Sequence, residues 1–543
     1  MFDFKRIGVL GWISLISAAL ILLPILAVVA SVLGPASDTW AHLARTALGH
    51  YVWNTALLLA GVACGVVSMG VLTAWLVTAY RFRGQRILEW ALVLPLAMPA
   101  YVMAYAYTDW LQFTGPVQSA LRAATGWQAR EYWFAEVRSI PGAAVILSLA
   151  LYPYVYLIAR TAFRDVSRSA LEAGRLAGYS AWGSFWRVAL PLARPAVVAG
   201  TALALMETLA DFGTVSYFGL EVFTTGIFKA WFSMEDSVAA GQLSTCLLLF
   251  VLLVLALERA SRGRAAYTSG ARKPSPPQQL TGAGAALALT ACAAPVLLGF
   301  VLPAGVLLQL AWSDPEARWS ARVLELVANS FTLAGAAALA GVAVATAMAY
   351  AARISKSPLV AAANRGAALG YAIPGAVIAV GVLVPLGRLD NWIADWLRAW
   401  FGISTGLLLT GTIAALVYAY LVRFLAVALQ TVEAGLAKVT PSMEDAARSL
   451  GASPATTLAR VHAPLLASSL ASAGLLLFVD VMKELPSTFA LRPFNFDTLA
   501  VAAYHLAKDE RLAEAAVPSL LIVAIGLAPL LLLSRRYLQA TRP

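Results

Sequence analysis

The stretch SALEAGRLAGYSAWGSFWRVALPL, residues 169–192, decides the fold because it occurs a second time, as SMEDAARSLGASPATTLARVHAPLL from Ser442. An offset of 273 residues superimposes the two copies and brings Gly178 onto Gly451. Each copy predicts a helix, a turn and a second helix. A segment repeated at so long and constant a spacing predicts that the chain holds two copies of one larger unit.

Polar and glycine residues mark the predicted helix ends. Three pairs stand at equivalent places: Ser169 with Glu172 and Ser442 with Asp445 as capping boxes, Gly178 and Gly451 as left-handed helix ends, and Ser180 and Ser453 as caps of the second helix. Pro454 takes the first-turn position of that second helix. The second helices run towards Pro191 and Pro464, where the sequence becomes apolar again.

The composition predicts an all-α, polytopic membrane protein. Of 543 residues, 60% are hydrophobic and 12% are charged, with a mean hydropathy of +0.76. Twelve apolar segments approach or exceed the roughly 20 residues that cross a bilayer. They are residues 7–33, 52–78, 88–110, 142–158, 192–209, 238–257, 283–312, 331–352, 366–386, 406–428, 465–481 and 512–533.

The spans divide into two repeats around a linker. Residues 259–281 are rich in Arg, Ser, Pro and Gly, which is typical of a linker, and they separate a first repeat (1–258) from a second (282–543). At an offset of 275, Asn54-Thr55 matches Asn329-Ser330 and Pro99 matches Pro374. A six-span unit returns to its starting side, so the two repeats are predicted to be parallel. The prolines are predicted to bend the third span of each repeat.

The basic residues set the predicted orientation. The net charge is +11, and arginines cluster at residues 81–86, 259–264 and 535–536. With both termini in the cytoplasm, these clusters and both copies of the repeated segment lie inside, as the positive-inside rule requires. The positive charge is therefore interpreted as a membrane signature, and no nucleic-acid partner is expected.

The sequence offers no catalytic, metal or cofactor motif. It contains no Gly-Lys-Ser/Thr, so no P-loop is predicted, and an ATPase or a soluble capture protein would be separate polypeptides. The three cysteines lie in apolar runs without a C-x-x-C pair. A membrane-embedded enzyme is therefore disfavoured.

Acidic residues follow or end the fifth span of each repeat. Glu207 aligns with Asp480, and Asp211 aligns with Glu484. Acids at such places are costly unless they face a cavity, a partner or the interface. The functional interpretation is a translocation path or outer gate. The structural alternatives are an ion pair, such as Lys483 with Asp480 or with Glu484, and simple exposure at the outer surface.

Other polar and aromatic residues are assigned structural roles. Asn54 and Asn329 are expected to bond a neighbouring helix rather than the substrate. Six tyrosines are interpreted as an interfacial belt in preference to ligands of a hard metal ion. They are Tyr101, Tyr105, Tyr107, Tyr152, Tyr154 and Tyr156.

The repeated segment resembles the EAA loop of binding-protein-dependent ABC transporter permeases. The residues that match this motif are Glu172, Ala173, Gly174 and Gly178 in the first copy, and Asp445, Ala446, Ala447 and Gly451 in the second. Three residues depart from the family motif: Gly174 replaces an alanine, Asp445 replaces the glutamate, and Ala463 replaces the leucine of a Leu-Pro pair that follows the loop. The resemblance implies a type I importer fold in a bacterial inner membrane. It also implies two copies of a cytoplasmic ATPase that receive the loops as coupling helices, and a periplasmic binding protein.

Two further stretches resemble the fused ferric-iron ABC permeases: DFGT at 211–214 and KELPSTFALRPFNFDTLA at 483–500. The resemblance implies ferric iron as the substrate. Permeases for thiamine, polyamines or phosphonates remain alternatives. An ion-coupled secondary transporter is a more distant one, since it would not need two EAA-like loops.

Overall fold

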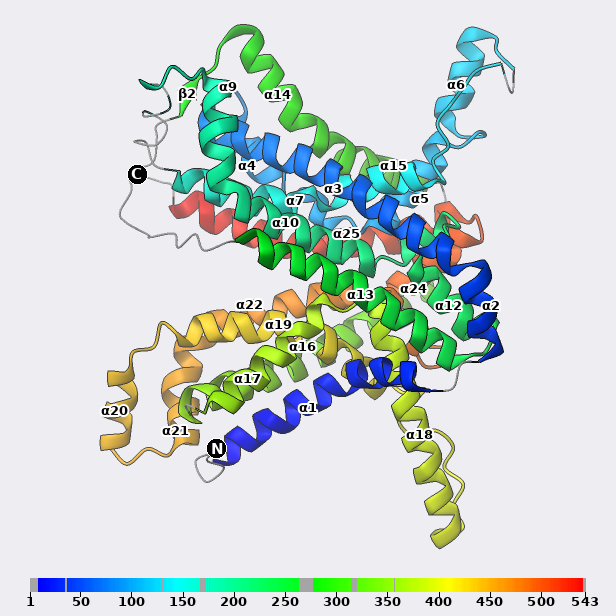
Figure 1. Ribbon diagram of the computed structural model, residues 1–543, viewed down its shortest axis with the longest axis vertical. Coiled ribbons are helices and arrows are strands. Elements are labelled where there is room, and N and C mark those ends of the chain that lie inside the picture. The colour runs from blue at the N-terminus through cyan, green and yellow to red at the C-terminus, as the bar shows by residue number, and fades with distance from the viewer. Residues whose placement is uncertain are drawn as a thin grey trace. The chain divides into compact units, whose positions relative to one another are not determined.

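The chain is almost entirely helical in a computed structural model (Figure 1). The structure describes residues 8–34, 37–128, 131–166, 172, 174, 176–262, 277–313, 320–355 and 357–540. Within them, 11 helices are long and apolar enough to cross a membrane, or up to 12 if a bent pair counts as one span. The prediction of an all-α membrane protein with about 12 spans is confirmed.

The helices cover the predicted spans, although the bounds of the fifth, ninth and eleventh spans are shifted and the third is broken. The first half contains α1 (Val9–Ala30), η2 (Ser31–Leu33), α2 (Asp38–Thr46), α3 (Leu48–Ala79), α4 (Gln85–Ala91), η3 (Leu94–Ala97), α5 (Ala100–Leu111), α6 (Pro116–Thr125), α7 (Ile140–Asp165), α9 (Ala181–Ser184), η4 (Phe185–Ala189), α10 (Leu190–Ala210), α11 (Gly213–Tyr217), α12 (Phe223–Phe228), η5 (Lys229–Ser233) and α13 (Ser237–Arg262). The strands β1 (Tyr80–Arg81) and β2 (Gln278–Gln279) pair in parallel.

The second half repeats this order. It contains α14 (Gly282–Val296), η6 (Leu297–Val301), α15 (Leu302–Ser313), α16 (Ala321–Ser355), α17 (Pro358–Ala367), η7 (Ala368–Ala372), α18 (Gly375–Phe401), α19 (Ile413–Leu436), α20 (Pro441–Ser449), α21 (Pro454–Thr457), η8 (Leu458–His462), α22 (Ala463–Met482), α23 (Pro486–Leu491), α24 (Leu499–Lys508) and α25 (Leu512–Ala540).

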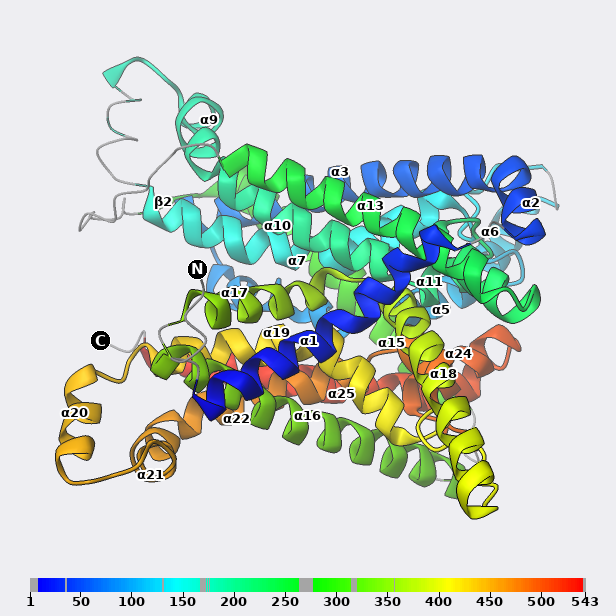
Figure 2. The ribbon, with the colours of Figure 1, turned by 60° about the horizontal axis from the view of Figure 1, so that its bottom comes forward.

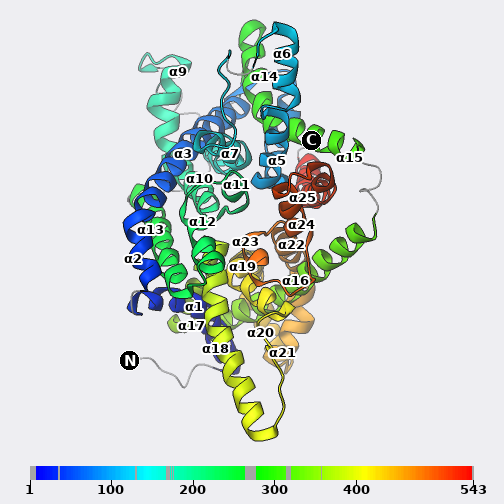
Figure 3. The same cartoon turned by 90° about the vertical axis from the view of Figure 1, so that its right-hand side faces the viewer.

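Proline breaks the third span of each half, as predicted. Pro99 precedes α5 and Pro374 precedes α18, each with φ of −58° and an extended ψ. Proline lacks a backbone N–H and disfavours a helical conformation in the residue before it, so a helix ends ahead of it. In the first half the helical segments on either side of Pro99 meet at 92°. In the second half, the helix that follows the proline, α18, extends well beyond its neighbours (Figure 3).

The helices form two compact units that draw on both halves of the sequence. Unit 1 comprises Met1–Ala41, Ile227–Thr245 and Ala321–Val501, and unit 2 comprises His42–Gly226, Cys246–Ser320 and Ala502–Pro543. The helix α13 is thus divided at Thr245. Two parallel repeats remain a prediction, but each unit combines the middle spans of one half with the first span of the other.

In unit 1, the first helix of the chain packs on second-half helices. Helix α1 contacts α16, α17 and α18. The contact is close, because a Cβ on Gly381 would lie 2.4 Å from the Pro24 carbonyl oxygen, so no larger residue fits there. The Tyr418 hydroxyl donates a hydrogen bond of 2.5 Å to the Leu20 carbonyl, and Ser14 donates one of 2.7 Å to Asn364.

Unit 2 shows the reciprocal arrangement. The helices α14, α15 and α25 of the second half pack on α3, α5 and η3 of the first. A Cβ on Gly299 would lie 2.9 Å from the Leu149 carbonyl, and one on Gly526 would lie 2.9 Å from the Ala97 carbonyl. Both glycines therefore allow a backbone approach that any side chain would block. The sequence repeats do not reveal this exchange of first helices.

Candidate functional site

The two EAA-like loops share one turn. In each, the first helix ends at a glycine with positive φ, +81° at Gly178 and +79° at Gly451. The N–H of Tyr179 donates a hydrogen bond of 3.0 Å to the Gly174 carbonyl, and the N–H of Ala452 donates one of 3.0 Å to Ala447. These equivalent bonds across the glycine are those of a Schellman motif. The predicted left-handed helix ends are confirmed.

The predicted caps of the second loop helix are confirmed as well. The Ser180 Oγ accepts from the Gly183 N–H at 3.1 Å, and the Ser453 Oγ accepts from the Thr456 N–H at 3.2 Å. Helix α21 begins at Pro454. A serine cap accepts a hydrogen bond from an otherwise unpaired N–H, and a proline at the first helical position removes one. Both second loop helices therefore start at a defined residue.

The predicted capping box at Ser442 is wrong. Helix α20 begins one residue earlier, at Pro441, with Thr440 as its N-cap residue. Proline favours the first helical position, so Ser442 already lies inside the helix, where its side chain cannot cap the first turn. Asp445 instead pairs with Arg448 on the exposed surface of the same helix. In the first copy, Ser169 and Ala173 lie outside the described residues.

The small residues of the motif allow the two loop helices to meet. Gly174 is buried, and a Cβ on it would lie 3.2 Å from a methyl group of Val188 on the second loop helix. Its equivalent, Ala447, is also buried. Glu172 and Ala446, by contrast, are exposed. The motif therefore has one face that holds the loop together and one that is exposed.

An arginine that sequence reasoning missed anchors the second loop. Arg353, near the end of α16, places its Nε 2.5 Å from the Glu444 carboxylate on α20 and donates to the carbonyls of Leu436 and Val439. His462 is buried 3.3 Å from the same carboxylate. In the sequence, the only feature that could have singled out Glu444 is its position next to the motif residue Asp445. Helices α20 and α21 lie at one end of unit 1, beyond the ends of α19 and α22 (Figure 2).

Each loop runs without a break into the next span. The fifth span begins at Trp182 rather than near 192, and the eleventh at Leu458 rather than near 465. The join is a π-helical turn, η4 or η8, that ends just before Leu190-Pro191 or Ala463-Pro464. Proline cannot donate to the helix and its ring crowds the carbonyl four residues back, and a wider turn accommodates both effects.

The other ends of these helices carry the predicted acidic residues. After α10, the Asp211 carboxylate accepts from the N–H groups of Thr214 and Val215 at 3.1 and 3.2 Å. After α22, the Glu484 carboxylate accepts from the N–H groups of Ser487 and Thr488 at 2.9 and 3.0 Å. The two acids thus cap α11 and α23 in the same way.

The acids differ in their cationic partners. Glu484 is buried and forms an ion pair of 2.9 Å with Arg423, and Asp480 pairs with Lys483 at 2.9 Å. The structural ion pair of Lys483 with Asp480 is therefore confirmed, whereas Glu484 pairs with an arginine that the sequence reasoning did not consider. Glu207 lies half-buried one turn before Asp211. The path or gate assignment of these four acids remains a proposal.

The interpretation of the tyrosines as an interfacial belt is wrong for five of the six, while Tyr154 is half-buried. The other five are buried within unit 2: Tyr101, Tyr105, Tyr107, Tyr152 and Tyr156. Tyr107 donates to the Leu298 carbonyl at 2.7 Å and Tyr156 donates to the Glu89 carbonyl at 2.6 Å. A belt would turn these rings towards the membrane surface, but the local helix packing turns them inwards.

The paired asparagines each bond the backbone of a distant segment, as expected, although each partner carbonyl lies in a connection rather than in a helix. Asn54 donates to the Glu221 carbonyl at 2.8 Å, and Asn329 donates to the Asp497 carbonyl at 3.1 Å. The next residue of each pair, Thr55 or Ser330, accepts a hydrogen bond from a backbone N–H in the segment before the last span of its half.

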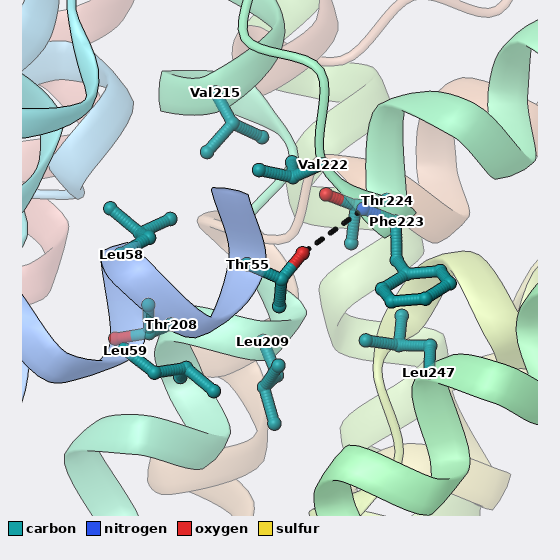
Figure 4. Close-up of a pocket in the computed structure, with 10 residues that line it drawn as sticks. All are labelled: Thr55, Leu58, Leu59, Thr208, Leu209, Val215, Val222, Phe223, Thr224 and Leu247. Atoms are coloured by element: carbon teal, nitrogen blue, oxygen red, sulfur yellow. Dashed lines mark hydrogen bonds between the residues drawn. The ribbon is translucent and has the colours of Figure 1, made fainter. Parts of the chain in front are cut away.

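Thr55 also lines a small pocket of unit 2 with apolar neighbours such as Leu209, Val215 and Phe223 (Figure 4). This pocket has no charged lining residue, so it does not suit an ion.

No group of three or more His, Cys, Asp or Glu side chains that could hold a metal ion occurs in the described ranges. Within the same ranges, the arrangement supplies two helix-turn-helix loops and two capped turns.

The chain was compared with known proteins. Residues 66–262 match the family model described as "Binding-protein-dependent transport system inner membrane component". The chain is 27% identical over 505 residues to an Fe(3+)-transport system permease protein, FbpB 2, of Haemophilus influenzae, covering 91% of each chain. It is 24% identical over 523 residues to a probable ABC transporter permease of Sinorhizobium fredii, covering 90% of this chain and 88% of the relative.

A shorter match links the chain to another substrate class. The sulfate transport system permease protein CysT of Escherichia coli is 30% identical over 148 residues, which is 27% of this chain and 50% of that protein. The first two relatives align over about nine tenths of this chain, which carries both loops. Residues 66–262 therefore carry the domain of the binding-protein-dependent transport system inner-membrane components, and the chain as a whole is similar to permease subunits of ABC transporters.

Proposed function

We propose that this protein is the permease subunit of an ATP-driven importer of ferric iron. The observation that supports this substrate is the similarity to an Fe(3+)-transport permease, 27% identity over 91% of both chains. The match to a sulfate permease covers 27% of the chain. General chemistry agrees, because the acidic residues near the ends of α10 and α22 suit a hard cation better than an oxyanion.

The two loops support a division of labour with other subunits. In both loops the first helix ends in the same Schellman turn, and each loop has an exposed face. Each loop can therefore bind one copy of a cytoplasmic ATPase, which gives two copies in all. A periplasmic binding protein delivers the iron to the opposite side. Closure of the ATPases on ATP then moves both loops, and the helices that continue from them carry the motion into the membrane. Both termini and the linker face the cytoplasm in this proposal.

Uptake by the reconstituted transporter tests the substrate. The permease, its ATPase and its binding protein are placed in liposomes, and ATP-dependent uptake of radioactive iron from ferric citrate is compared with that of sulfate, thiamine and putrescine. Iron uptake that stops without ATP or without the binding protein is expected. Uptake of one of the other compounds with none of iron would remove ferric iron from the assignment and leave the permease assignment in place.

A further inference from the structure

The part of α18 that extends beyond its neighbours, residues 387–401, carries an exposed apolar stripe. Three tryptophans spaced by four residues form its centre: Trp392, Trp396 and Trp400, with exposed fractions of 64%, 46% and 75%. At about 1.5 Å and 100° per residue, they make a row about 12 Å long on one side of the helix. Leu389 and Ile393 fall on the same side, so the five residues lie within an arc of about 100°. We refer to them as the tryptophan face. An apolar stripe of this width usually packs against a protein core.

The opposite side of the same segment is polar. It carries Arg388, Asn391, Asp395 and Arg398, all of them exposed. Arg398 comes two residues after Trp396, which turns it by about 200° and places it nearly opposite. Charged side chains are costly in the hydrocarbon of a bilayer. Residues 387–401 therefore cannot be surrounded by lipid, although α18 as a whole is long and apolar enough to cross a membrane.

A buried carboxylate fixes this segment in place. Asp390 is 1% exposed and accepts hydrogen bonds from the N–H groups of Leu408, Leu409 and Thr410 at 3.1, 2.8 and 2.6 Å. The Thr410 hydroxyl donates to it at 2.5 Å. These donors belong to the connection between α18 and α19. Asp390 lies about 160° from Trp392 around the helix, so the connection covers another side and leaves the tryptophan face open.

Within unit 1, the segment runs across the direction of the spans. Helices α19 and α22 pack side by side, and α18 crosses their direction at the end remote from α20 and α21 (Figure 1 and Figure 2). Spans lie near the bilayer normal, so a helix that crosses them at their ends runs along the membrane surface. The segment also follows directly on the predicted ninth span, residues 366–386. Its exposed face is therefore continuous with the part of the chain that enters the membrane.

We propose that the tryptophan face of α18 binds the lipid–water interface at the end of unit 1 remote from the second loop. Tryptophan is enriched at this interface because its ring is apolar while its N–H can bond to headgroups or water. A helix with an aromatic apolar face and a charged face settles there, with the first in lipid and the second in water. A lipid partner thus accounts for the composition of both faces and for the direction of the segment.

The anchor is specific to the second half of the sequence. At the offset of 275 that relates the two prolines of the third spans, the three tryptophans correspond to Val117, Leu121 and Thr125. The equivalent positions of the first half therefore hold no tryptophan. The proposal does not depend on which substrate is imported, because it concerns a surface outside the loops and the capped turns.

Site-directed fluorescence in the complete chain tests the tryptophan face. The three native cysteines are replaced by alanine, and a single cysteine is introduced as Trp396→Cys on the tryptophan face or as Arg398→Cys on the polar face. Each variant is reconstituted into liposomes and carries the same environment-sensitive label. The label is quenched from the lipid, by phospholipids with a nitroxide near the headgroup, or from water, by iodide. Arg398→Cys is the matched control because it is exposed on the same helix but faces the other way.

We expect the lipid quencher to act more strongly at position 396 and iodide to act more strongly at position 398. Trp400→Cys should repeat the result of Trp396→Cys, and two of the three tryptophans remain in each variant. Stronger quenching by iodide than by lipid at 396 would overturn the proposal. So would a label at 396 that neither quencher reaches, which would place the face against a second copy of the chain. Protection from iodide that appears only when the purified binding protein is added would assign the face to that protein and overturn the lipid assignment.

Discussion

Replacing Gly451 by valine isolates the contribution of the loop turn. The residue has φ of +79°, and a Cβ built there meets no atom within 4 Å. The substitution therefore causes no clash, and its whole effect is the strain of a left-handed backbone, about 1–2 kcal/mol for an ordinary residue and more for a β-branched one. A change of this size alters the equilibrium between formed and unformed turn about 5- to 30-fold.

The assay is binding of the purified ATPase subunit to the permease in nanodiscs, together with iron uptake. Because apparent affinity scales with the fraction of formed turn, we expect it to fall in Gly451→Val by up to about 5- to 30-fold, the full factor applying when the turn becomes mostly unformed. The matched control is Gly451→Asn, since asparagine adopts the left-handed conformation more readily and should bind more tightly than the valine variant. Gly178→Val should behave like Gly451→Val, because its φ is +81° and its surroundings are equally open. Equal affinity for the valine and asparagine variants, or normal uptake by a double valine variant, would refute the reasoning.

Three further predictions follow from the structure. Arg423→Met should destabilise the protein by about 3–5 kcal/mol because it leaves Glu484 buried and unpaired. In a thermal unfolding assay, adding Glu484→Gln should restore most of the lost stability. Equal melting temperatures for the single and double variants would contradict this. With cysteines introduced at positions 128 and 275, an impermeant thiol reagent added outside cells should label 128 and spare 275, and the opposite pattern would invert the topology. Pro464→Ala restores a backbone N–H and should let the π-turn tighten. The loop would then rotate against its span by about 100°, the turn per residue of a helix. Uptake should fall at unchanged expression, and normal uptake would show that the wide turn is dispensable.

Local features were predictable because they depend on neighbours in the sequence. The glycine turns at Gly178 and Gly451, the serine caps and the breaks at Pro99 and Pro374 each follow from the conformational preference of one residue. The one local failure, Ser442, arose because the competing start signal of Pro441 was not weighed. Signals of this kind also recur at one offset, so each copy served as a check on the other.

The long-range features could not be read from the sequence. No periodicity shows that α1 packs on α16 to α18, because an apolar span suits any apolar neighbour. Arg423 lies 61 residues from Glu484, and nothing local links the two. The tyrosines of α5 and α7 were assigned to an interfacial belt because composition gives the character of a helix but not the direction of its faces. These features depend on which helices meet, and that is decided by packing.

The unbroken helix that follows each loop has a mechanical consequence. Residues Trp182–Ala210 form one rod of 29 residues, about 44 Å long at 1.5 Å per residue. The loop turn at Gly178 precedes one end of this lever and the Asp211 cap follows the other. If the rod tilts by about 10°, its two ends shift by about 8 Å relative to each other, by the geometry of a rod of that length. A displacement imposed at the loop is thus delivered to the carboxylate directly, and the stiffness of a single helix sets how much of it is lost on the way.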